Sequence, residues 1–499
     1  MDELVQTAGL SPLLVPPNRR QRDAIVIDLA VAFSLRTADV APMDPLLVDY
    51  NRAIAYLYER INYERTADSV PYPFRLRRMH QLVASLDLAD ICGRNVPLVH
   101  IAGTKGKGST ASMVATMLSA GGYRVGLYTS PHLIKLEERF TVNGELASER
   151  DVIALIDAIA PIADDLGNSD LGSPTFFEFT TAMALLYFKQ RNCTAVVLEV
   201  GLGGKLDSTN VCTPTVTAIT SIGYDHQHIL GNTLAEIAAQ KAGIIKPGVP
   251  VVSGTTEPEA REVIERIAAQ TKARLYAIGD AFEVKVVASE MSKTWSTCFD
   301  LISHDTSIRP REHWSISLDG YHQAANAAVA CTIMDQLTAR GIDVPIEAQE
   351  TALADVRIAG RVERFPFRPG VDVILDTSHN IDSIAALCRC VQARRGDRPV
   401  TVVFGTSRDK HHIPMLAELC EVADAILLTR YHNNPRFREP QDLMRDLPAS
   451  RTTIASIQDD PVTAVRESLS RVTGSHLIVV CGSFFLAAEI RPLLESMSK

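Results

Sequence analysis

The sequence predicts an α/β protein with two domains: a large domain built on a mainly parallel sheet, followed by a smaller Rossmann-like α/β domain. Short runs of strand formers alternate with helical runs between residues 97 and 254, which is typical of parallel strands joined by crossover helices. A glycine-rich stretch at 103–108 lies between an apolar run that resembles a strand and another that resembles a helix. Beyond Arg357 the alternation starts again, which indicates the second unit.

Length and composition limit the class of protein. A chain of 499 residues is too long for one core, at roughly 100 to 200 residues per domain. Hydrophobic residues make up 46% and charged residues 22%, as in soluble proteins. The net charge of -9 gives no electrostatic reason to expect nucleic acid or a membrane as a partner. We expect a monomer that binds small molecules.

Cysteine usage and apolar runs indicate the compartment. The nine cysteines contain no CxxC pair, so neither a disulfide framework nor a zinc ribbon is indicated, and a reducing compartment fits best. The longest apolar stretch near the start, residues 24–35, contains Asp28 and is too short to span a bilayer. We therefore expect a cytoplasmic protein.

Three segments follow along the chain. Residues 1–45 read as an irregular extension with room for one short helix, residues 46–356 as the central domain, and residues 357–499 as the C-terminal domain. Helical spacing of apolar residues predicts two helices, at 47–61 and 75–91, before the glycine-rich stretch.

Within the central domain, the run 98–103 is predicted to be a strand and the run 109–118 a helix. Further strands are predicted at 124–130, 195–201, 216–223 and 249–254, and further helices at 151–166, 176–191 and 233–245. Residues 282–318 are richer in strand formers and turn residues, which predicts a small β-rich insertion, and a helix over 322–340 should end at Gly341.

The same alternation describes the C-terminal domain. Strands are predicted at 371–375, 399–405, 425–430 and 476–481, and helices at 383–395, 413–423, 461–472 and 484–496.

The stretch GTKGKGST, residues 103–110, has the composition of a phosphate-binding loop. Backbone N–H groups at a helix start lack intrahelical partners and attract anions, and glycines let the backbone approach phosphate oxygens. Lys107 supplies a mobile positive charge, and Ser109 or Thr110 can hold a magnesium ion. Gly108 interrupts the usual GxxxxGK[ST] pattern, and the alternative is a flexible surface turn with solvated lysines. The flanking strand and helix favour phosphate binding, which makes the large domain a P-loop ATPase domain.

The pattern GTxGKG[ST] resembles the loop of the Mur ligase superfamily, which joins a carboxylate to an amine using ATP. Over about residues 46–498, further segments resemble folylpolyglutamate synthases and dihydrofolate synthases in that family's order: TSPHL, LEVGLGGKLDSTN, YDHQH, AAQKAGIIKPG, HQAANA, GRVE, DTSHN, SRDK and CGSFF. The resemblance implies an ATP-dependent ligase of folate metabolism. It would add L-glutamate to dihydropteroate, to folates or to both through an acyl phosphate, with release of ADP and phosphate.

The resemblance also implies roles for individual residues. The ATP phosphates would contact Gly103, Thr104, Gly106, Lys107, Gly108, Ser109 and Thr110. Asn326 would contact adenine, Arg361 would reach the phosphates from the domain junction, and Asp376 and His379 would lie near ribose and the incoming glutamate, with Ser483 a further glutamate contact. The magnesium ligands would be Ser130, Glu199 and His226, and a monovalent cation is also implied.

Two further groups follow from the resemblance. Lys241 aligns with a lysine that the family carboxylates, and with Lys107, Arg361 and His379 it would take part in catalysis. The folate pocket would contain Phe177, Thr181 and the turn from Asp207 and Ser208 to Thr209.

Without the resemblance, several of these residues have ordinary explanations. Glu199 ends an apolar strand, where a charge is costly unless it is paired or lies at the carboxyl rim of the sheet. Lys241 would be a helix-end lysine that complements the dipole, and Phe177 a core residue. Ser483 would be a turn serine, and we expect His228 to be an ordinary polar residue.

The sequence departs from the family's pattern at three positions. Lys105 replaces an asparagine, Thr377 replaces a glycine, the residue that adopts positive φ most readily, and Gln240 replaces a glutamate. Three alternatives stay open: a peptidoglycan-precursor Mur ligase, a non-catalytic nucleotide-binding paralogue, and, more remotely, a P-loop kinase. The sequence does not decide between dihydropteroate and folate acceptors.

Overall fold

The computed structural model describes residues 45–60, 76–287 and 295–498. The extension expected at 1–45 lies almost wholly outside these residues. The chain divides into two compact units, Met1–Arg52 and Ala53–Lys499, and helix α2 (Pro45–Tyr58) runs across their boundary in the sequence. Among the described residues, no helix combines the length and the apolar character that crossing a membrane requires.

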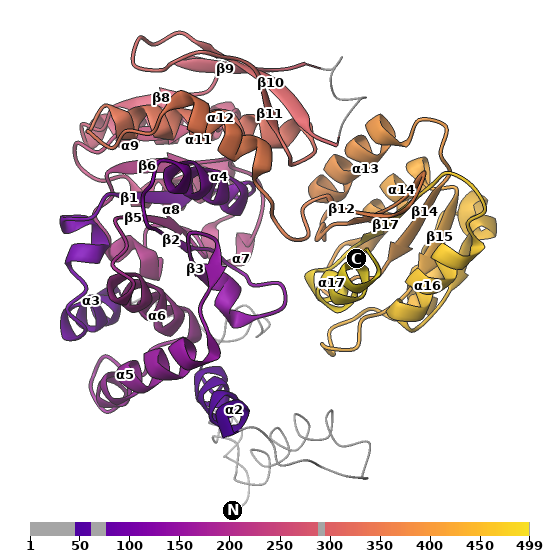
Figure 1. The fold of residues 1–499 in the computed structure, drawn as a ribbon, viewed down its shortest axis with the longest axis horizontal. Helices are drawn as coiled ribbons and strands as arrows, with labels where there is room; N and C mark the ends of the chain where they lie inside the picture. Colours follow the sequence, from indigo (N-terminus) through magenta and orange to yellow (C-terminus); the bar gives the residue numbers. More distant parts are fainter. Residues whose placement is uncertain (1–44, 61–75, 288–294, 499) are drawn as a thin grey trace, which may run out of the picture. The chain divides into compact units, whose positions relative to one another are not determined.

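The central domain is built on an eight-stranded sheet with the order β4-β3-β2-β5-β1-β6-β7-β8 (Figure 1). The strands are β1 (Leu98–Ala102), β2 (Val125–Tyr128), β3 (Phe140–Val142), β4 (Glu145–Leu146), β5 (Ala195–Glu199), β6 (Val216–Ile219), β7 (Val251–Ser253) and β8 (Leu275–Ala277). Strands β2, β5, β1, β6, β7 and β8 pair in parallel, and only the β3 and β4 edge is antiparallel. The predicted mainly parallel sheet is confirmed.

Helices cover both faces of this sheet. They are α3 (Leu76–Ser85), α4 (Lys107–Ala120), α5 (Glu149–Gly167), α6 (Phe176–Gln190), α7 (Gln227–Leu230), α8 (Leu234–Lys241), α9 (Pro258–Gln270), α11 (Tyr321–Thr338) and α12 (Ile346–Asp355). Side chains alternate along β1, so Val99 and Ile101 join the core under α4 and α11, while Ala102 points to the other face, against Ile244.

Local signals start three of these helices. Helices α5, α6 and α8 begin at the capping boxes Ser148/Asp151, Thr175/Glu178 and Thr233/Glu236, in which each side chain satisfies the other residue's free backbone N–H. The β-rich insertion is a three-stranded antiparallel sheet, β11-β10-β9, formed by β9 (Phe282–Val286), β10 (Thr297–Ser303) and β11 (Arg311–Ile316).

The C-terminal domain has a six-stranded sheet with the order β12-β13-β17-β14-β15-β16. The strands are β12 (Glu363–Arg368), β13 (Val371–Leu375), β14 (Val400–Phe404), β15 (Ala425–Leu428), β16 (Ala455–Ile457) and β17 (His476–Cys481), and the helices are α13 (Ile381–Arg395), α14 (His412–Val422), α15 (Pro440–Arg445), α16 (Pro461–Arg471) and α17 (Phe484–Met497). All pairs are parallel except β12 with β13. This is the predicted Rossmann-like unit.

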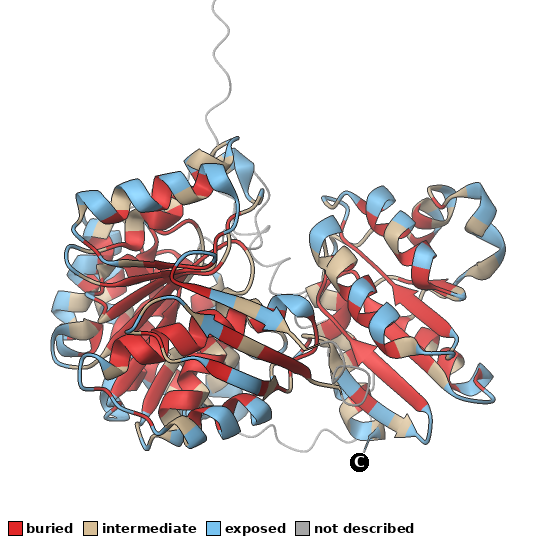
Figure 2. Ribbon diagram, turned by 90° about the horizontal axis from the view of Figure 1, so that it is seen from above, coloured by how far each residue is buried: buried red, intermediate tan, exposed pale blue. Residues whose placement is uncertain are grey.

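The inner strands β13, β14 and β17 of this sheet are buried on both faces, and such strands are red in Figure 2, whereas the edge strands β12 and β16 are largely exposed. Ile374 and Phe404 join the core beneath α13 and α14, whereas Val373 and Val403 join the core beneath α16 and α17. This period of two explains why the strands read as continuous apolar runs in the sequence.

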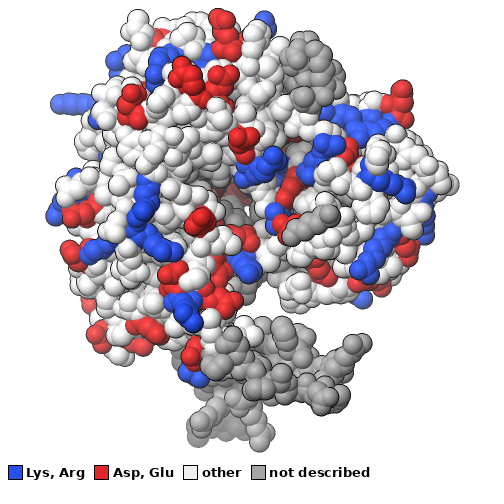
Figure 3. Space-filling view, viewed as in Figure 1, with Lys and Arg blue, Asp and Glu red and all other residues white. Residues whose placement is uncertain are grey.

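Charged side chains of both signs lie interspersed on the face drawn in Figure 3. This face therefore offers no large positive surface for anionic small molecules, which would depend on local groups there.

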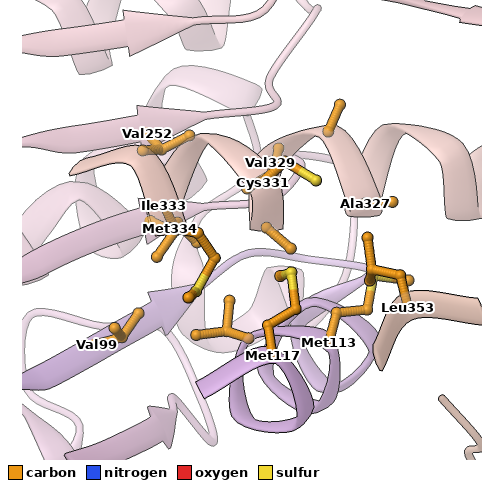
Figure 4. Close-up of a cluster of buried hydrophobic side chains, with 14 of the residues drawn as sticks. Val99, Met113, Met117, Val252, Ala327, Val329, Cys331, Ile333, Met334 and Leu353 are labelled. Carbon is orange, nitrogen blue, oxygen red and sulfur yellow. The ribbon is translucent and has the colours of Figure 1, made fainter. Parts of the chain in front are cut away.

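The largest core lies between the central sheet and the pair α4 and α11. Met113 and Met117 of α4 face Ile333 and Met334 of α11, and Leu353 of α12 closes the cluster (Figure 4). These five side chains are fully buried. Because α4 begins at the glycine-rich loop, this packing fixes the loop relative to the sheet.

We expect Ile333→Ala to lower the free energy of unfolding of the central domain by about 2–5 kcal/mol, because it leaves a cavity among packed side chains. Urea denaturation followed by circular dichroism measures this change. Ile302→Ala is the control, since Ile302 is 40% exposed and should change stability by no more than about 0.5 kcal/mol. Equal effects of the two substitutions would contradict this account of the core.

Candidate active site

Four loops meet at the carboxyl edge of the central sheet, where α/β proteins bind ligands. They follow β1, β2, β5 and β6, which lie side by side in the sheet. The loop after β1 bonds to the loop after β6, since Thr104 N donates to Ser221 O at 2.7 Å. The loops after β2 and β5 meet where Ser130 N donates to Glu199 Oε2 at 3.0 Å.

The glycine-rich loop has the conformation that its glycines allow. Gly106 adopts φ +82° immediately before α4, a conformation that favours glycine. A Cβ atom on Gly106 would lie 2.2 Å from Oδ1 of Asn326, so α11 packs directly against the loop. The residues predicted to wrap the ATP phosphates, 103–110, form this loop and the first turn of α4.

Lys107 and Glu199 form a pair of opposite charges, in which Glu199 is buried and Lys107 partly buried. The Lys107 Nζ atom lies 4.0 Å from Glu199 Oε1, and the Glu199 residue is 4% exposed. Burial raises the pKa of Glu199, and Lys107 and the Ser130 N–H oppose this effect by stabilising the carboxylate. Burial lowers the pKa of Lys107, which the carboxylate of Glu199 opposes. The pair lies against α4, because a Cβ atom on Gly108 would be 3.4 Å from Glu199 Oε2.

The donor set at this edge suits a hard cation. Ser130 carries a hydroxyl and Glu199 a carboxylate, and the Ser130 backbone N–H joins the two residues at the ends of adjacent strands. In the described ranges, no three His, Cys, Asp or Glu side chains are grouped closely enough to hold a metal alone. Mg²⁺ fits such a site, because it binds one or two protein oxygens and completes its shell with water and phosphate oxygens.

His226 lies on the loop after β6. Its backbone is left-handed, with φ +49°, and its N–H donates to Asp225 Oδ1 at 3.1 Å. The ring atom Nε2 lies 3.7 Å from the same oxygen. The ring of the neighbouring His228 is tilted by 59° relative to the His226 ring, and the two ring centroids are 6.3 Å apart.

Lys241 ends α8 and turns toward the glycine-rich loop. It is 5% exposed, and its Nζ donates to the Gly103 carbonyl at 2.8 Å rather than to a carbonyl of its own helix. Burial is the main cause that lowers its pKa to about 7, and Lys107 and Lys105 add to the effect. A substantial fraction of this amine is therefore neutral near pH 7.

The four residues predicted for the folate pocket also lie near one another. Thr181 Oγ1 lies 2.8 Å from Ser208 Oγ, and Thr181 also donates to the Phe177 carbonyl. The buried Asp207 accepts hydrogen bonds from the backbone of Leu202 and Thr209, which shapes the turn. Phe177 is half-buried, so part of its ring is exposed.

Three residues that sequence reasoning missed contact the residues predicted for the folate pocket. The Tyr128 ring lies 5.9 Å from that of Phe177, and a Cβ atom on Gly201 would lie 2.3 Å from Phe177 Cζ. His100 Nε2 lies 2.8 Å from Thr209 Oγ1, and burial lowers the pKa of His100 to about 3, so the ring is neutral. Glycines directly after a buried strand were the available signal for Gly201.

The predicted residues of the C-terminal domain lie at the carboxyl edge of its sheet. Asp376, directly after β13, accepts hydrogen bonds from the backbone N–H groups of Val362 and Ser378 at 2.7 and 2.8 Å. His379 Nδ1 lies 2.9 Å from the Thr377 carbonyl, so Nδ1 donates and Nε2 is left as the acceptor of a neutral ring. Burial lowers the pKa of His379 to about 4.

Thr377 does not carry the strain that its replacement of glycine suggested. The φ angle of Thr377 is not positive, and its hydroxyl donates to the Gly360 carbonyl at 3.1 Å. The neighbouring Arg361 guanidinium lies 5.6 Å from the Phe484 ring. Ser483 caps α17, since its Oγ accepts from Phe485 N at 3.1 Å, which agrees with the turn-serine alternative.

Further polar residues at this edge were not identified from the sequence. Ser407 follows β14, and its Oγ lies 2.7 Å from the hydroxyl of Tyr431, which follows β15. Arg436 lies on the next segment, where its carbonyl accepts a hydrogen bond from Arg408 N at 2.8 Å. Their positions after parallel strands were the signal that could have identified them.

Comparison with known proteins agrees with this geometry. Residues 101–334 match the Mur ligase middle domain, and residues 360–484 match the Mur ligase glutamate ligase domain. The dihydrofolate synthase/folylpolyglutamate synthase of Bacillus subtilis is 35% identical over 422 residues, which are 84% of this chain and 95% of that protein. The chain belongs to the folylpolyglutamate synthase family. As a member of this Mur ligase family it is an ATP-dependent ligase.

Solved structures of the family have the same fold. Folylpolyglutamate synthase from Thermotoga maritima superimposes with a TM-score of 0.77 at 32% identity and covers 90% of this chain and 97% of its own. E. coli FolC in complex with DHPP and ADP superimposes with a TM-score of 0.73 at 26% identity, and the match covers 92% of this chain and 100% of the FolC chain.

We expect Gly106→Ala to abolish nucleotide binding, because it adds a left-handed cost of about 1–2 kcal/mol and a clash with Asn326. Calorimetric titration with ADP and Mg²⁺ measures the affinity. The control is Gly122→Ala, at the other end of α4, where φ is +83° and a Cβ atom meets nothing within 4 Å. It should lower stability without changing the affinity, and loss of binding in both variants would contradict the argument from close approach.

Proposed function

We propose that this ligase joins L-glutamate to a carboxylate of dihydropteroate, of a folate or of both, through an acyl phosphate. The observation that carries the proposal is the convergence of a glycine-rich loop, the Lys107–Glu199 pair and the buried amine of Lys241 at one edge of the central sheet. A half-buried aromatic residue, Phe177, lies against Gly201, two residues after Glu199.

The chemistry explains the need for these charges. A carboxylate is a poor electrophile near pH 7, and transfer of the γ-phosphoryl group of ATP turns it into an acyl phosphate with a good leaving group. Two anions must meet in this step, so their repulsion must be neutralised and their approach oriented. Lys107 supplies positive charge to the phosphoryl oxygens, and Arg361 adds to it from the domain junction.

Ser130 and Glu199 would hold Mg²⁺, with His226 as the third ligand that the resemblance implies. When bound, Mg²⁺ supplies charge neutralisation and orientation of the phosphate oxygens. Before it binds, Lys107 faces Glu199 and opposes the rise in the pKa of this buried carboxylate. The monovalent cation stays a prediction, because no contact among the described residues identifies its ligands.

Carboxylation of Lys241 is supported by its pKa of about 7. The neutral amine can attack carbon dioxide, so that an N–C bond forms, a proton leaves and the side chain becomes an anionic carbamate. That change would relieve the repulsion between Lys241 and its neighbours Lys105 and Lys107, which already lowers the pKa of the amine.

The second half of the reaction belongs to the C-terminal domain. The incoming glutamate must lose a proton from its ammonium group before it attacks the acyl phosphate. The neutral His379 can accept a hydrogen bond from that group through Nε2 and so orient it, but its pKa of about 4 makes the ring a weak base. Asp376 would contact ribose, and Asn326 the adenine. Ser483, Ser407 and Arg436 offer two hydroxyls and a cation for the carboxylates of glutamate.

At the other end, the acceptor's pterin ring would lie on Phe177. The Gly201 backbone and the Tyr128 ring pack against the Phe177 ring. The part of the Phe177 ring that they leave uncovered would stack on the pterin. Thr181, Asp207 and Ser208 supply the polar groups beside it.

Phosphate release tests the proposal. Purified protein with ATP, Mg²⁺ and L-glutamate should release phosphate when dihydropteroate or tetrahydrofolate is added, and the stimulating acceptor defines the activity. Lys107→Ala and Glu199→Ala should each reduce turnover by about 10²–10³-fold or more, because each removes charge stabilisation from the transition state.

Three results would contradict this assignment. Near-normal turnover in either variant would show that the pair is not part of the catalytic site. Release that depends on a sugar-nucleotide acceptor would identify a peptidoglycan-precursor ligase, and nucleotide binding without release in the presence of all substrates would identify a non-catalytic paralogue.

Lys241 generates a separate prediction. At pH 8 about nine-tenths of an amine with a pKa near 7 is neutral, and at pH 6 about one-tenth, so carboxylation and turnover should rise between pH 6 and pH 8. Turnover should fall when carbon dioxide is removed, and Lys241→Arg should be inactive because arginine stays charged.

Carbon-13 NMR of protein in labelled bicarbonate measures the carbamate directly. The control is Lys246→Arg, since Lys246 donates to the Asn210 carbonyl away from the loop. A Lys241→Arg variant with normal turnover, or turnover that is indifferent to carbon dioxide, would exclude the carbamate.

A further inference from the structure

An ion pair joins two of the loops at the carboxyl edge of the central sheet. Lys105 lies within the glycine-rich loop, and its Nζ donates to Oδ2 of Asp225 at 2.9 Å. Asp225 directly precedes His226 on the loop after β6. Both side chains are partly exposed, 41% for Lys105 and 33% for Asp225, so solvent screens the pair and it contributes little to global stability. Any effect of this ion pair must therefore be on the local arrangement of the two loops.

We propose that Lys105 is a positioning residue that acts through Asp225 to hold the His226 segment, residues 224–226, against the glycine-rich loop. The proposal rests on the proposed function, because it assigns a task to a segment next to the expected ATP and Mg²⁺ site. The role is distinct from a direct contact between Lys105 and phosphate.

The first support is the pattern of contacts between the two loops. Thr104 N donates to Ser221 O, Thr104 Oγ1 contacts both polar atoms of the Gly223 backbone, and the Lys105 carbonyl accepts from Thr220 Oγ1 at 2.6 Å and from Ser221 Oγ at 3.0 Å. These bonds stop at Gly223. Across the part of the chain that the structure describes, the Lys105–Asp225 pair is the hydrogen bond that joins the next three residues to the loop.

The second support is that the two carboxylate oxygens of Asp225 have different partners. Oδ2 accepts from Lys105, while Oδ1 accepts the backbone N–H of His226 and lies 3.7 Å from the His226 ring. His226 has the left-handed φ of +49°, a conformation that a residue other than glycine adopts only when its surroundings hold it. One carboxylate therefore links the lysine to the backbone of the predicted metal ligand.

The third support is that the backbone of Lys105 is hydrogen-bonded to the loop after β6. Its N–H donates to Ser221 Oγ at 3.0 Å and its carbonyl accepts from the same loop, so both backbone groups are bonded toward the β6 side. Lys107, two residues later, faces Glu199 instead. The two lysines of the loop thus have separate partners, and Asp225 balances the charge of the one that does not face the buried carboxylate.

A double-mutant cycle of Lys105→Met and Asp225→Asn tests the proposal. Affinity for ADP is measured by calorimetry at several Mg²⁺ concentrations, and kcat and the KM for ATP are measured by phosphate release. If Lys105 acts through Asp225, each single variant should weaken Mg²⁺-dependent ADP binding by a similar factor, about fivefold to tenfold, and the double variant should be no worse. The charge-reversed pair Lys105→Asp with Asp225→Lys should recover part of the affinity.

The matched control is a surface pair of the same length. Lys189 Nζ lies 2.9 Å from Asp87 Oδ2, and its side chain is 43% exposed, close to the value for Lys105. Lys189→Met and Asp87→Asn should change neither ADP affinity nor turnover. Thermal unfolding of all variants should be nearly unchanged, which separates local positioning from loss of fold.

The outcomes are distinguishable. If Lys105→Met weakens ADP binding while Asp225→Asn leaves it unchanged or strengthens it, Lys105 contacts the phosphates directly and the proposal is wrong. Additive losses, or no loss in either single variant, also overturn it. Failure of the wild type to release phosphate with any folate acceptor would overturn the proposed function, whereas the calorimetric cycle would still report on Lys105 and Asp225.

Discussion

The Lys107–Glu199 pair is the interaction on which the arrangement of the site depends. A carboxylate at the end of an apolar strand can stay ionised only with a cation or backbone donors beside it, and Lys107 and the Ser130 N–H are those partners. This requirement brings the loops after β1, β2 and β5 to one place. The same burial that makes each charge costly also strengthens the attraction between the two.

Both sheets reach their functional residues by the same rule. In each, parallel strands are buried on both faces, so polar side chains that belong to the chemistry lie beyond the strand ends. Glu199 closes β5, and Asp376 follows β13. Each is satisfied by backbone N–H groups of a neighbouring loop, which fixes its orientation before any substrate arrives.

Close backbone approach is the second constraint. At Gly106 a side chain would collide with Asn326, and at Gly201 it would collide with the ring of Phe177. Gly106 lets α11 pack directly on the glycine-rich loop, and Gly201 lets the ring of Phe177 lie close to the backbone after β5. At Thr377 the opposite holds, because φ is not positive and the hydroxyl gains a bond to the Gly360 carbonyl.

The sequence by itself determined the architecture: the alternation of strands and helices, the β-rich insertion, the glycine-rich loop and the strand-end positions of Glu199 and Asp376 all follow from local patterns. Tertiary structure alone decided which loops meet, because contacts such as Lys105–Asp225 join residues 120 positions apart. It also decided the pKa of Lys241, since burial and the nearby amines lower it far below the value of an ordinary helix-end lysine. Local sequence patterns do not reveal which side chains distant segments will bury. For this reason the sequence predicts the helices and strands but not the pKa of Lys241.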